Sequence, residues 1–228
     1  MNNLSLFLAS VEFSDYLFHT GITIAIVLIS TICAYLLGIP LGIILNVTDK
    51  NGIYKCKPVN LILGVIINIF RSAPFIILLV FLLPYIRKMI GTGVGNVPFT
   101  VALIIAAVPF VSRMVESSLK EIDYGIIEAS LAMGASKFEI IFKVMLPEIK
   151  SSLIVGATIS FATILGYSAM SGYIGGDGLG NLAIQIGYIR GQEEVTFISL
   201  AALIIIVQIF QEAGYFIAKK LDHRKKGE

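Results

Sequence analysis

Few side chains in this sequence could carry out catalytic chemistry, because histidines, cysteines and paired acids are scarce. His19 and His223 stand near opposite ends of the chain, and Cys33 and Cys56 fall in an apolar stretch and a polar loop. Two cysteines can form neither a disulfide framework nor a four-ligand metal site. The sequence also has no Ser/His/Asp set and no H-E-x-x-H motif. We therefore expect no catalytic residue, no metal site and no cofactor in this chain.

A glycine-rich run, GYIGGDGLGN (Gly172–Asn181), could in principle cradle a phosphate group. It lacks the lysine of the G-x-x-x-x-G-K-[ST] motif and follows an apolar segment instead of a strand. We therefore predict a mobile turn here and no nucleotide site.

A single basic residue, Arg71, interrupts a long apolar stretch. A helix rising 1.5 Å per residue would carry it about 21 Å from Lys57. An arginine at the centre of a membrane costs roughly 2.5–3.5 kcal/mol on insertion scales, so it needs a partner, a cavity or a place near the surface. In one interpretation Arg71 packs, binding carbonyls freed by Pro74 or bridging to Glu116 or Glu212. In the other it lines a translocation path, where its guanidinium could meet a carboxylate.

A second candidate path consists of hydroxyl and apolar side chains farther along the chain. Ser160, Thr163 and Tyr167 recur at i, i+3 and i+7, so a helix would place them on one face. In membrane bundles such residues more often mediate helix packing. The alternative is that this face lines a pathway, with Tyr167 and Met170 forming an apolar gate.

The composition predicts which elements hold these residues. Hydrophobic residues make up 57% of the 228 positions and charged residues 14%, whereas soluble domains carry about 25% charge. The mean hydropathy is +0.90. These values exclude a soluble enzyme and a nucleic-acid-binding domain. They predict an all-α, polytopic membrane protein, because lipid offers no partner to an unpaired backbone group.

Long apolar stretches between charged residues predict five transmembrane helices, since a bilayer core of about 30 Å needs about 20 apolar residues. Arg71 interrupts the second stretch, and the fifth extends past Glu212. Pro40, Pro74 and Pro109 fall inside the first three stretches and should kink their helices. An odd number of crossings places the two termini on opposite sides. The stretches lie within residues 16–48, 57–87, 88–113, 150–177 and 194–218.

The basic residues predict which side faces the cytoplasm. With the N-terminus outside, 13 of the 17 lysines and arginines lie in the inner loops and tail, and 3 lie outside. This is the positive-inside distribution. We therefore expect an extracytoplasmic segment (1–18), a transmembrane domain (19–218) and a basic cytoplasmic tail (219–228).

The inner segment 113–150 is longer than two adjacent helices require, so it should have structure of its own. Small residues between Ile126 and Met133 predict one short helix, and Gly134 permits a sharp turn after it. The result would be two short helices with a glycine bend, lying along the inner membrane surface.

The second of these short helices carries clear local signals. Ser136 followed by Glu139 is a capping box, which marks a helix start. Glu139 and Lys143 form an i,i+4 pair in the favourable order. Ile140, Ile141, Val144 and Met145 recur on one face, and the helix should end at Pro147.

This segment resembles the EAA loop of permease subunits in type I ABC importers. The family pattern is E-A-A, three residues, G, nine residues, I, one residue, L-P. Here Ser130 replaces the second alanine and Val144 replaces the isoleucine. In the family this loop is the coupling helix, which sits in a cleft of the cytoplasmic ATPase. The resemblance thus implies that seven residues couple this chain to an ATPase: Glu128, Ala129, Ser130, Gly134, Val144, Leu146 and Pro147.

Three further stretches narrow the resemblance to the permeases of methionine importers: Asn68–Leu79, Pro109–Leu119 and Ala157–Tyr188. The resemblance implies a homodimer in the bacterial cytoplasmic membrane that imports methionine, in its L- or D-form or both. The implied partners are cytoplasmic ATP-binding subunits, which hydrolyse the ATP, and an extracytoplasmic substrate-binding protein or lipoprotein. No nucleic acid is expected to bind.

Two alternatives remain beside this interpretation. The same importer class could carry another amino acid or a small polar solute, because selectivity in the family rests heavily on the binding protein. The chain could instead be an ATP-independent carrier or channel. A secondary carrier is expected to hold ion-coupling acids inside its helices, whereas here only Glu116 and Glu212 approach the membrane, both near inner ends.

Overall fold

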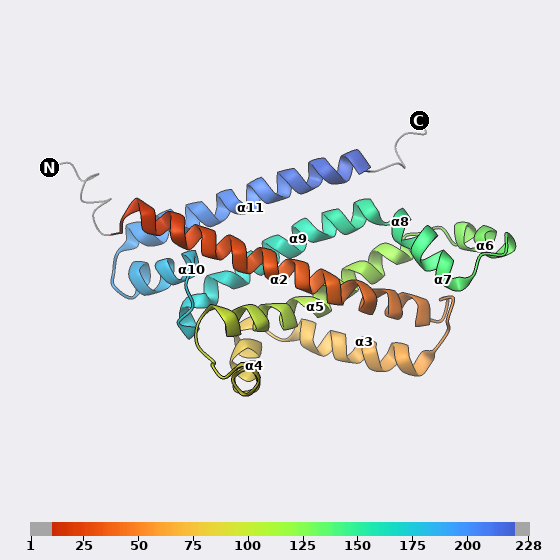
Figure 1. The fold of residues 1–228 in the computed structure, drawn as a ribbon, viewed down its shortest axis with the longest axis horizontal. Coiled ribbons are helices and arrows are strands. Elements are labelled where there is room, and N and C mark those ends of the chain that lie inside the picture. The colour runs from red at the N-terminus through yellow and green to blue at the C-terminus, as the bar shows by residue number, and fades with distance from the viewer. Residues whose placement is uncertain (1–10, 222–228) are drawn as a thin grey trace. The chain divides into compact units, whose positions relative to one another are not determined.

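A computed structural model describes residues 11–221, which form helices and connecting turns with no strand in that range (Figure 1). The prediction of an all-α protein is confirmed. The long apolar stretches form helices because a helix satisfies the hydrogen bonds of its own backbone. The elements are α2 (Phe13–Thr48), α3 (Lys57–Ser72), α4 (Phe75–Ile90), α5 (Asn96–Lys120), α6 (Tyr124–Ala132), α7 (Lys137–Glu139), η1 (Ile140–Met145), α8 (Leu146–Glu148), α9 (Lys150–Ser168), η2 (Ala169–Ile174), α10 (Leu179–Asn181), η3 (Leu182–Tyr188) and α11 (Glu193–Leu221).

Four spans are long and apolar enough to cross a bilayer: α2, α5, α9 continued by η2, and α11. Helices α3 and α4 pass the same test only as a pair, because they are bent by 110° at the break between them. Counted as one broken span, this pair gives the fifth predicted crossing.

The break between α3 and α4 lies at Pro74. Proline lacks a backbone N–H and disfavours helical geometry in the residue before it, and Pro74 itself has φ −59° and ψ 130°. The predicted kink at Pro74 is confirmed, and it is strong enough to divide the segment into two separate helices. Pro40 and Pro109, by contrast, lie inside the continuous helices α2 and α5.

The inner ends of two helices differ from the expected bounds. Helix α5 continues to Lys120, seven residues beyond Arg113, and α11 continues to Leu221. Charged residues in α5 do not end it, since they pair with one another on one helix face. Part of the expected inner loop is therefore the last two turns of α5. The basic residues Arg224, Lys225 and Lys226 lie outside the described residues.

The chain divides into two compact units. The first comprises the described residues up to Cys33, Ala73–Ala107 and Phe161–Phe210. The second comprises Ala34–Ser72, Val108–Ser160 and the residues from Gln211 onward. Helices α2, α5, α9 and α11 each contribute residues to both units.

Close helix contacts in the second unit depend on small residues. A Cβ on Gly38 of α2 would lie 2.6 Å from Cγ1 of Val111 in α5, and one on Gly42 would lie 2.6 Å from the carbonyl oxygen of Ser112. A Cβ on Gly214 of α11 would collide with the methyl group of Thr158 in α9. Small residues let membrane helices approach closely and gain van der Waals contact.

In the first unit, side chains hold the backbone of the glycine-rich run. The N–H groups of Gly178 and Leu179 donate to His19 Nδ1 (3.0 Å) and Thr23 Oγ1 (2.9 Å) in α2. The N–H of Asp177 donates to Asn96 Oδ1 in α5, at 2.6 Å. The structure thus differs from the predicted mobile turn, because acceptors distant in sequence satisfy these N–H groups.

Candidate functional site

Helix α6 begins the inner segment and presents two of the predicted coupling residues to solvent. Asp123 caps the helix by accepting a 2.8 Å hydrogen bond from the N–H of Gly125, which satisfies one of the donors left free at a helix start. Glu128 and Ala129 are exposed, whereas Ser130 is buried. The hydroxyl of Ser130 donates to the carbonyl of Ile126 at 2.8 Å. The serine that replaces alanine in the EAA pattern is therefore satisfied within its own helix.

Gly134 ends α6 in a Schellman motif. The N–H of Gly134 donates to the carbonyl of Leu131 at 3.0 Å, and the N–H of Ala135 donates to the carbonyl of Ser130 at 3.1 Å. This motif needs a residue in the left-handed region, where glycine pays no Cβ penalty. Gly134 has φ +83°. The predicted bend is confirmed, and the glycine of the EAA pattern has a backbone role.

The capping box after this bend is also confirmed. Ser136 Oγ accepts from the N–H of Glu139, while a carboxylate oxygen of Glu139 accepts from the N–H of Ser136 at 3.1 Å. Glu139 Oε1 also pairs with Lys143 Nζ at 2.8 Å. The hydrogen bond from Lys143, followed by those from Ser136, lowers the pKa of Glu139 to about 2. The carboxylate therefore stays charged at physiological pH and holds this turn.

The rest of the second helix differs from the expected α-helix. Residues of η1 are π-helical, and the N–H of Leu146 bonds to the carbonyl of Ile141, five residues back. The end predicted at Pro147 is wrong, because α8 continues to Glu148 and α9 starts at Lys150. Pro147 lies in the first turn of α8, which follows η1 without a break.

The apolar face predicted for this helix is largely confirmed. Ile140 is fully buried, and Ile141 and Met145 are 8% and 2% exposed. Val144 and Leu146, both in the EAA pattern, are half-buried, and Pro147 is exposed. Four of the seven predicted coupling residues are therefore exposed: Glu128, Ala129, Gly134 and Pro147.

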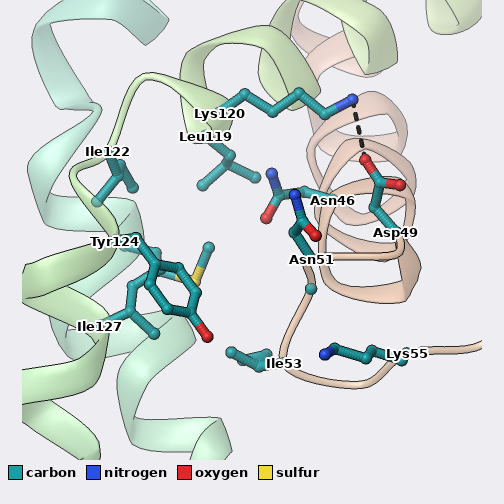
Figure 2. Close-up of a pocket in the computed structure, with 12 residues that line it drawn as sticks. Asn46, Asp49, Asn51, Ile53, Lys55, Leu119, Lys120, Ile122, Tyr124 and Ile127 are labelled. Carbon is teal, nitrogen blue, oxygen red and sulfur yellow. Dashed lines mark ion pairs between the residues drawn. The ribbon is translucent and has the colours of Figure 1, made fainter.

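A cavity of about 630 Å³ lies behind α6, between this helix and the connection from α2 to α3. Figure 2 shows Asn46, Asp49 and Asn51 on one side of it, with Ile122 and Ile127 on the other. Lys120 reaches across one edge to Asp49. The cavity therefore has a polar wall and an apolar wall, joined by an ion pair.

The sequence interpretation missed a cluster of charges at the inner end of α5. Glu116 accepts from Arg113 at 2.6 Å and from Lys120 at 2.7 Å. Lys120 also pairs with Asp49 at 3.2 Å. The spacing of 113, 116 and 120 puts alternating charges on one helix face, and this signal could have predicted the cluster.

The same contacts decide one question about Arg71. Both carboxylate oxygens of Glu116 are occupied by Arg113 and Lys120, so the proposed bridge from Arg71 to Glu116 is wrong. Arg71 lies exposed in the last turn of α3 and has no hydrogen bond or ion pair with any residue between 11 and 221. The expected bonds to carbonyls near Pro74 and to Glu212 are also absent from this part of the chain.

The other candidate path residues divide between the two units. Ser160 belongs to the second unit, is fully buried and donates to the sulfur of Met114 at 3.7 Å. Thr163, Tyr167 and Met170 belong to the first unit and are half-buried. The ring of Tyr167 stacks on Phe75, with centroids 4.7 Å apart. Ser160 and Tyr167 thus both make contacts of the kind expected if this face mediates helix packing.

Comparison with known sequences settles the family. Residues 38–226 match the sequence model described as "binding-protein-dependent transport system inner membrane component". The chain belongs to this family. It is a multi-pass inner membrane permease, a transport component, as its sequence resemblance to importer permeases predicts.

Named relatives resemble this permease over most of its length. It is 41% identical over 202 residues to the "Probable D-methionine transport system permease protein MetI" of Vibrio cholerae, covering 89% of this chain and 90% of that protein. It is 41% identical over 181 residues to the "Methionine import system permease protein MetP" of Bacillus subtilis, covering 79% and 82%.

A solved structure resembles the permease in fold as well as in sequence. A chain of the MetNI methionine ABC transporter, in an inward-facing conformation, superposes with a TM-score of 0.89 and 38% identity. The match covers 98% of this chain and 100% of that chain. The predicted resemblance to methionine-importer permeases is confirmed.

Proposed function

We propose that this permease is the membrane subunit of an ATP-driven importer that moves methionine across the cytoplasmic membrane. The observation that carries the proposal is 41% identity, over 89% of the chain, to a permease named for D-methionine transport. Similarity to a chain of a methionine ABC transporter supports the same substrate. Another amino acid or a small polar solute is the main alternative.

The importer would be a homodimer of this chain with two ATPase subunits and a substrate-binding protein. Residues 11–221 supply at most five spans, which are few to enclose a passage for an amino acid. Hydrolysis of ATP belongs to the partner ATPase. ATP binding closes the ATPase pair, the inner segment of each permease moves with it, and the bundle opens outward to receive methionine.

Reconstitution into vesicles tests the substrate. The purified permease, its ATPase and its binding protein are combined, and uptake of labelled L- and D-methionine is measured with and without ATP. We expect ATP-dependent uptake that unlabelled methionine suppresses. Suppression by a different amino acid alone would transfer the proposal to that solute, and uptake without ATP would favour a carrier or channel.

The seven residues of the EAA pattern would couple the permease to its ATPase. Exposure of Glu128 and Ala129, with the bend at Gly134, supports a docking role. Gly134→Pro should abolish uptake and co-purification of the ATPase, because proline is confined to φ near −65°. Gly91→Pro is a matched control, since Gly91 also has φ +83° but lies in a different turn. Unimpaired docking and uptake in Gly134→Pro would refute the coupling assignment.

Arg71 and the face of Ser160, Thr163, Tyr167 and Met170 would contribute to the translocation path. Arg71 is free of partners between residues 11 and 221, and this supports a role toward substrate or a second subunit. Arg71→Ala should lower uptake per folded transporter more than Arg190→Ala, which also removes an exposed arginine. Equal uptake by the two variants would exclude the path role of Arg71.

The N-terminus would lie outside and the C-terminus in the cytoplasm. The asymmetric distribution of lysine and arginine supports this orientation. In a chain lacking Cys33 and Cys56, an impermeant thiol reagent applied to intact cells should label Thr92→Cys and spare Asn51→Cys. The reverse pattern would invert the topology.

A further inference from the structure

Charged side chains on one face of α5 form a continuous polar cluster with α2 and α3. The cluster consists of Asp49, Asn68, Arg113, Glu116 and Lys120, and we call it the Glu116 cluster. Arg113, Glu116 and Lys120 follow one another at i, i+3 and i+7, so they line the last two turns of α5. All five residues lie in the second unit.

The cluster connects α5 to both neighbouring helices. Arg113 Nη2 donates to the carbonyl of Gly64 at 3.1 Å and to Asn68 Oδ1 at 3.0 Å, both in α3. Lys120 Nζ pairs with Asp49 Oδ2 at 3.2 Å, one residue beyond α2. A separate bond, from Asn60 Nδ2 to the carbonyl of Leu45 at 2.7 Å, joins α3 to α2. The three helices therefore share one hydrogen-bonded framework.

Glu116 is the centre of this framework. Its side chain is 7% exposed, and each carboxylate oxygen accepts from a different cation. The cluster contains two positive and two negative groups, so its net charge is zero. A buried carboxylate is costly unless it is paired, and removing it leaves its cations uncompensated. A neutral side chain at position 116 would therefore loosen both connections at once.

The position of the cluster links it to the inner segment. Only residues 121–123 separate Lys120 from the start of α6, and the last of them, Asp123, caps that helix. Tyr124 and Ile127 of α6 line the cavity, and Asn51 and Ile53 of the connection between α2 and α3 line it as well. The pair of Lys120 with Asp49 spans its edge (Figure 2). A displacement of α6 therefore reaches α2 and α3 through α5 and this cluster.

We propose that Glu116 is a positioning residue that transmits movement of α6 to α2 and α3, and so couples ATP hydrolysis to transport. The proposal rests on the proposed function, because it assigns the path by which ATPase movement at α6 reaches the membrane helices. It predicts a separation of two activities: loss of the cluster should leave ATPase docking intact and reduce the methionine moved per ATP hydrolysed.

The test measures both activities in the same vesicles. Reconstituted complexes of parental permease, Glu116→Gln, Asp49→Asn and Asn68→Leu are compared for ATP hydrolysis stimulated by the binding protein and for methionine uptake. Glu193→Gln is the control, because it neutralises an exposed carboxylate at the start of α11 that forms no ion pair with any residue between 11 and 221. We expect uptake per ATP to fall by about 3- to 10-fold in the three cluster variants and to stay unchanged in the control.

Each outcome decides the proposal. Uptake and hydrolysis that fall in parallel would overturn it, since that pattern indicates lost folding or docking. A parental ratio in Glu116→Gln would also overturn it. If Glu116→Gln does not assemble, Asp49→Asn and Asn68→Leu carry the same test, because each cuts only one end of the cluster. Failure of the parental complex to import methionine would instead refute the proposed function.

Discussion

His19 and Gly178, which lie 159 positions apart in sequence, are joined by a direct hydrogen bond. His19 Nδ1 accepts from the backbone N–H of Gly178 at 3.0 Å. One turn farther along α2, the Thr23 hydroxyl accepts from the N–H of Leu179 and donates to the carbonyl of His19, both at 2.9 Å. A ring nitrogen that accepts must be unprotonated. These contacts fix the glycine-rich run to α2.

Removing either acceptor, His19 Nδ1 or Thr23 Oγ1, should loosen the glycine-rich run from α2. Thr23→Val keeps the side-chain volume and His19→Phe keeps a planar ring, but each leaves the N–H of Leu179 or Gly178 without its partner. One hydrogen bond contributes about 1 kcal/mol, so amide exchange in peptides that contain Gly178 and Leu179 should accelerate about fivefold. Thr31→Val is the control, because the Thr31 hydroxyl bonds only within α2. Unchanged exchange in His19→Phe would contradict the anchoring role.

Packing of α11 against α9 should fail when a methyl group is added at Gly214. Gly214→Ala places its Cβ against the methyl group of Thr158, and overpacking of this kind costs about 1–3 kcal/mol. The melting temperature in detergent should fall. Adding Thr158→Ser should restore it, because serine lacks that methyl group. Gly21→Ala should not destabilise, since its Cβ meets nothing within 4 Å. An equal loss in the single and double variants would exclude this clash as the cause.

The bend at Gly134 should tolerate asparagine better than alanine. A left-handed conformation costs an ordinary L-residue roughly 1–2 kcal/mol, and asparagine adopts it more readily. Space does not restrict the site, because a Cβ on Gly134 meets nothing within 4 Å. ATPase co-purification and uptake should therefore decrease in the order Gly134, Gly134→Asn, Gly134→Ala. A steric explanation would instead make the larger asparagine the worse substitution.

The capping box should resist acid as long as Lys143 is present. The hydrogen bond from Lys143 is the main cause that lowers the pKa of Glu139 to about 2. A depressed pKa means that the stabilising contribution is present above the unfolded value of about 4.3 and is lost as the pH falls toward 2. An NMR titration checks this: the Glu139 carboxyl should remain mostly ionised at about pH 3. Its resonance is assigned by its absence from the spectrum of Glu139→Gln.

Substitution of Lys143 tests the cause of this shift. Lys143→Met should raise the pKa of Glu139, so that much of the carboxyl is protonated at about pH 3. The hydrogen bonds from Ser136 would still hold part of the shift. An unchanged midpoint in Lys143→Met would assign the low pKa to Ser136 alone.

Local signals predicted much of the fold and of the inner segment. Long uncharged stretches indicate membrane helices because lipid cannot satisfy a free backbone group. The capping box of Ser136 and Glu139 and the turn at Gly134 involve residues only a few positions apart. Their geometry depends on the helix itself, so the sequence is enough to predict it. The π-helical η1 and the continuation past Pro147 were not predicted, since they depend on how this segment joins α9.

The sequence by itself determined the helical class, the apolar spans and the EAA pattern, because these follow from composition and short-range spacing. Only the tertiary structure decided which partners the charged and polar groups have. Arg113 reaches Asn68, which lies 45 positions away, and His19 reaches Gly178 in another part of the chain. Such pairs form when helices pack, and side-chain distances across a packed interface cannot be read from the order of residues.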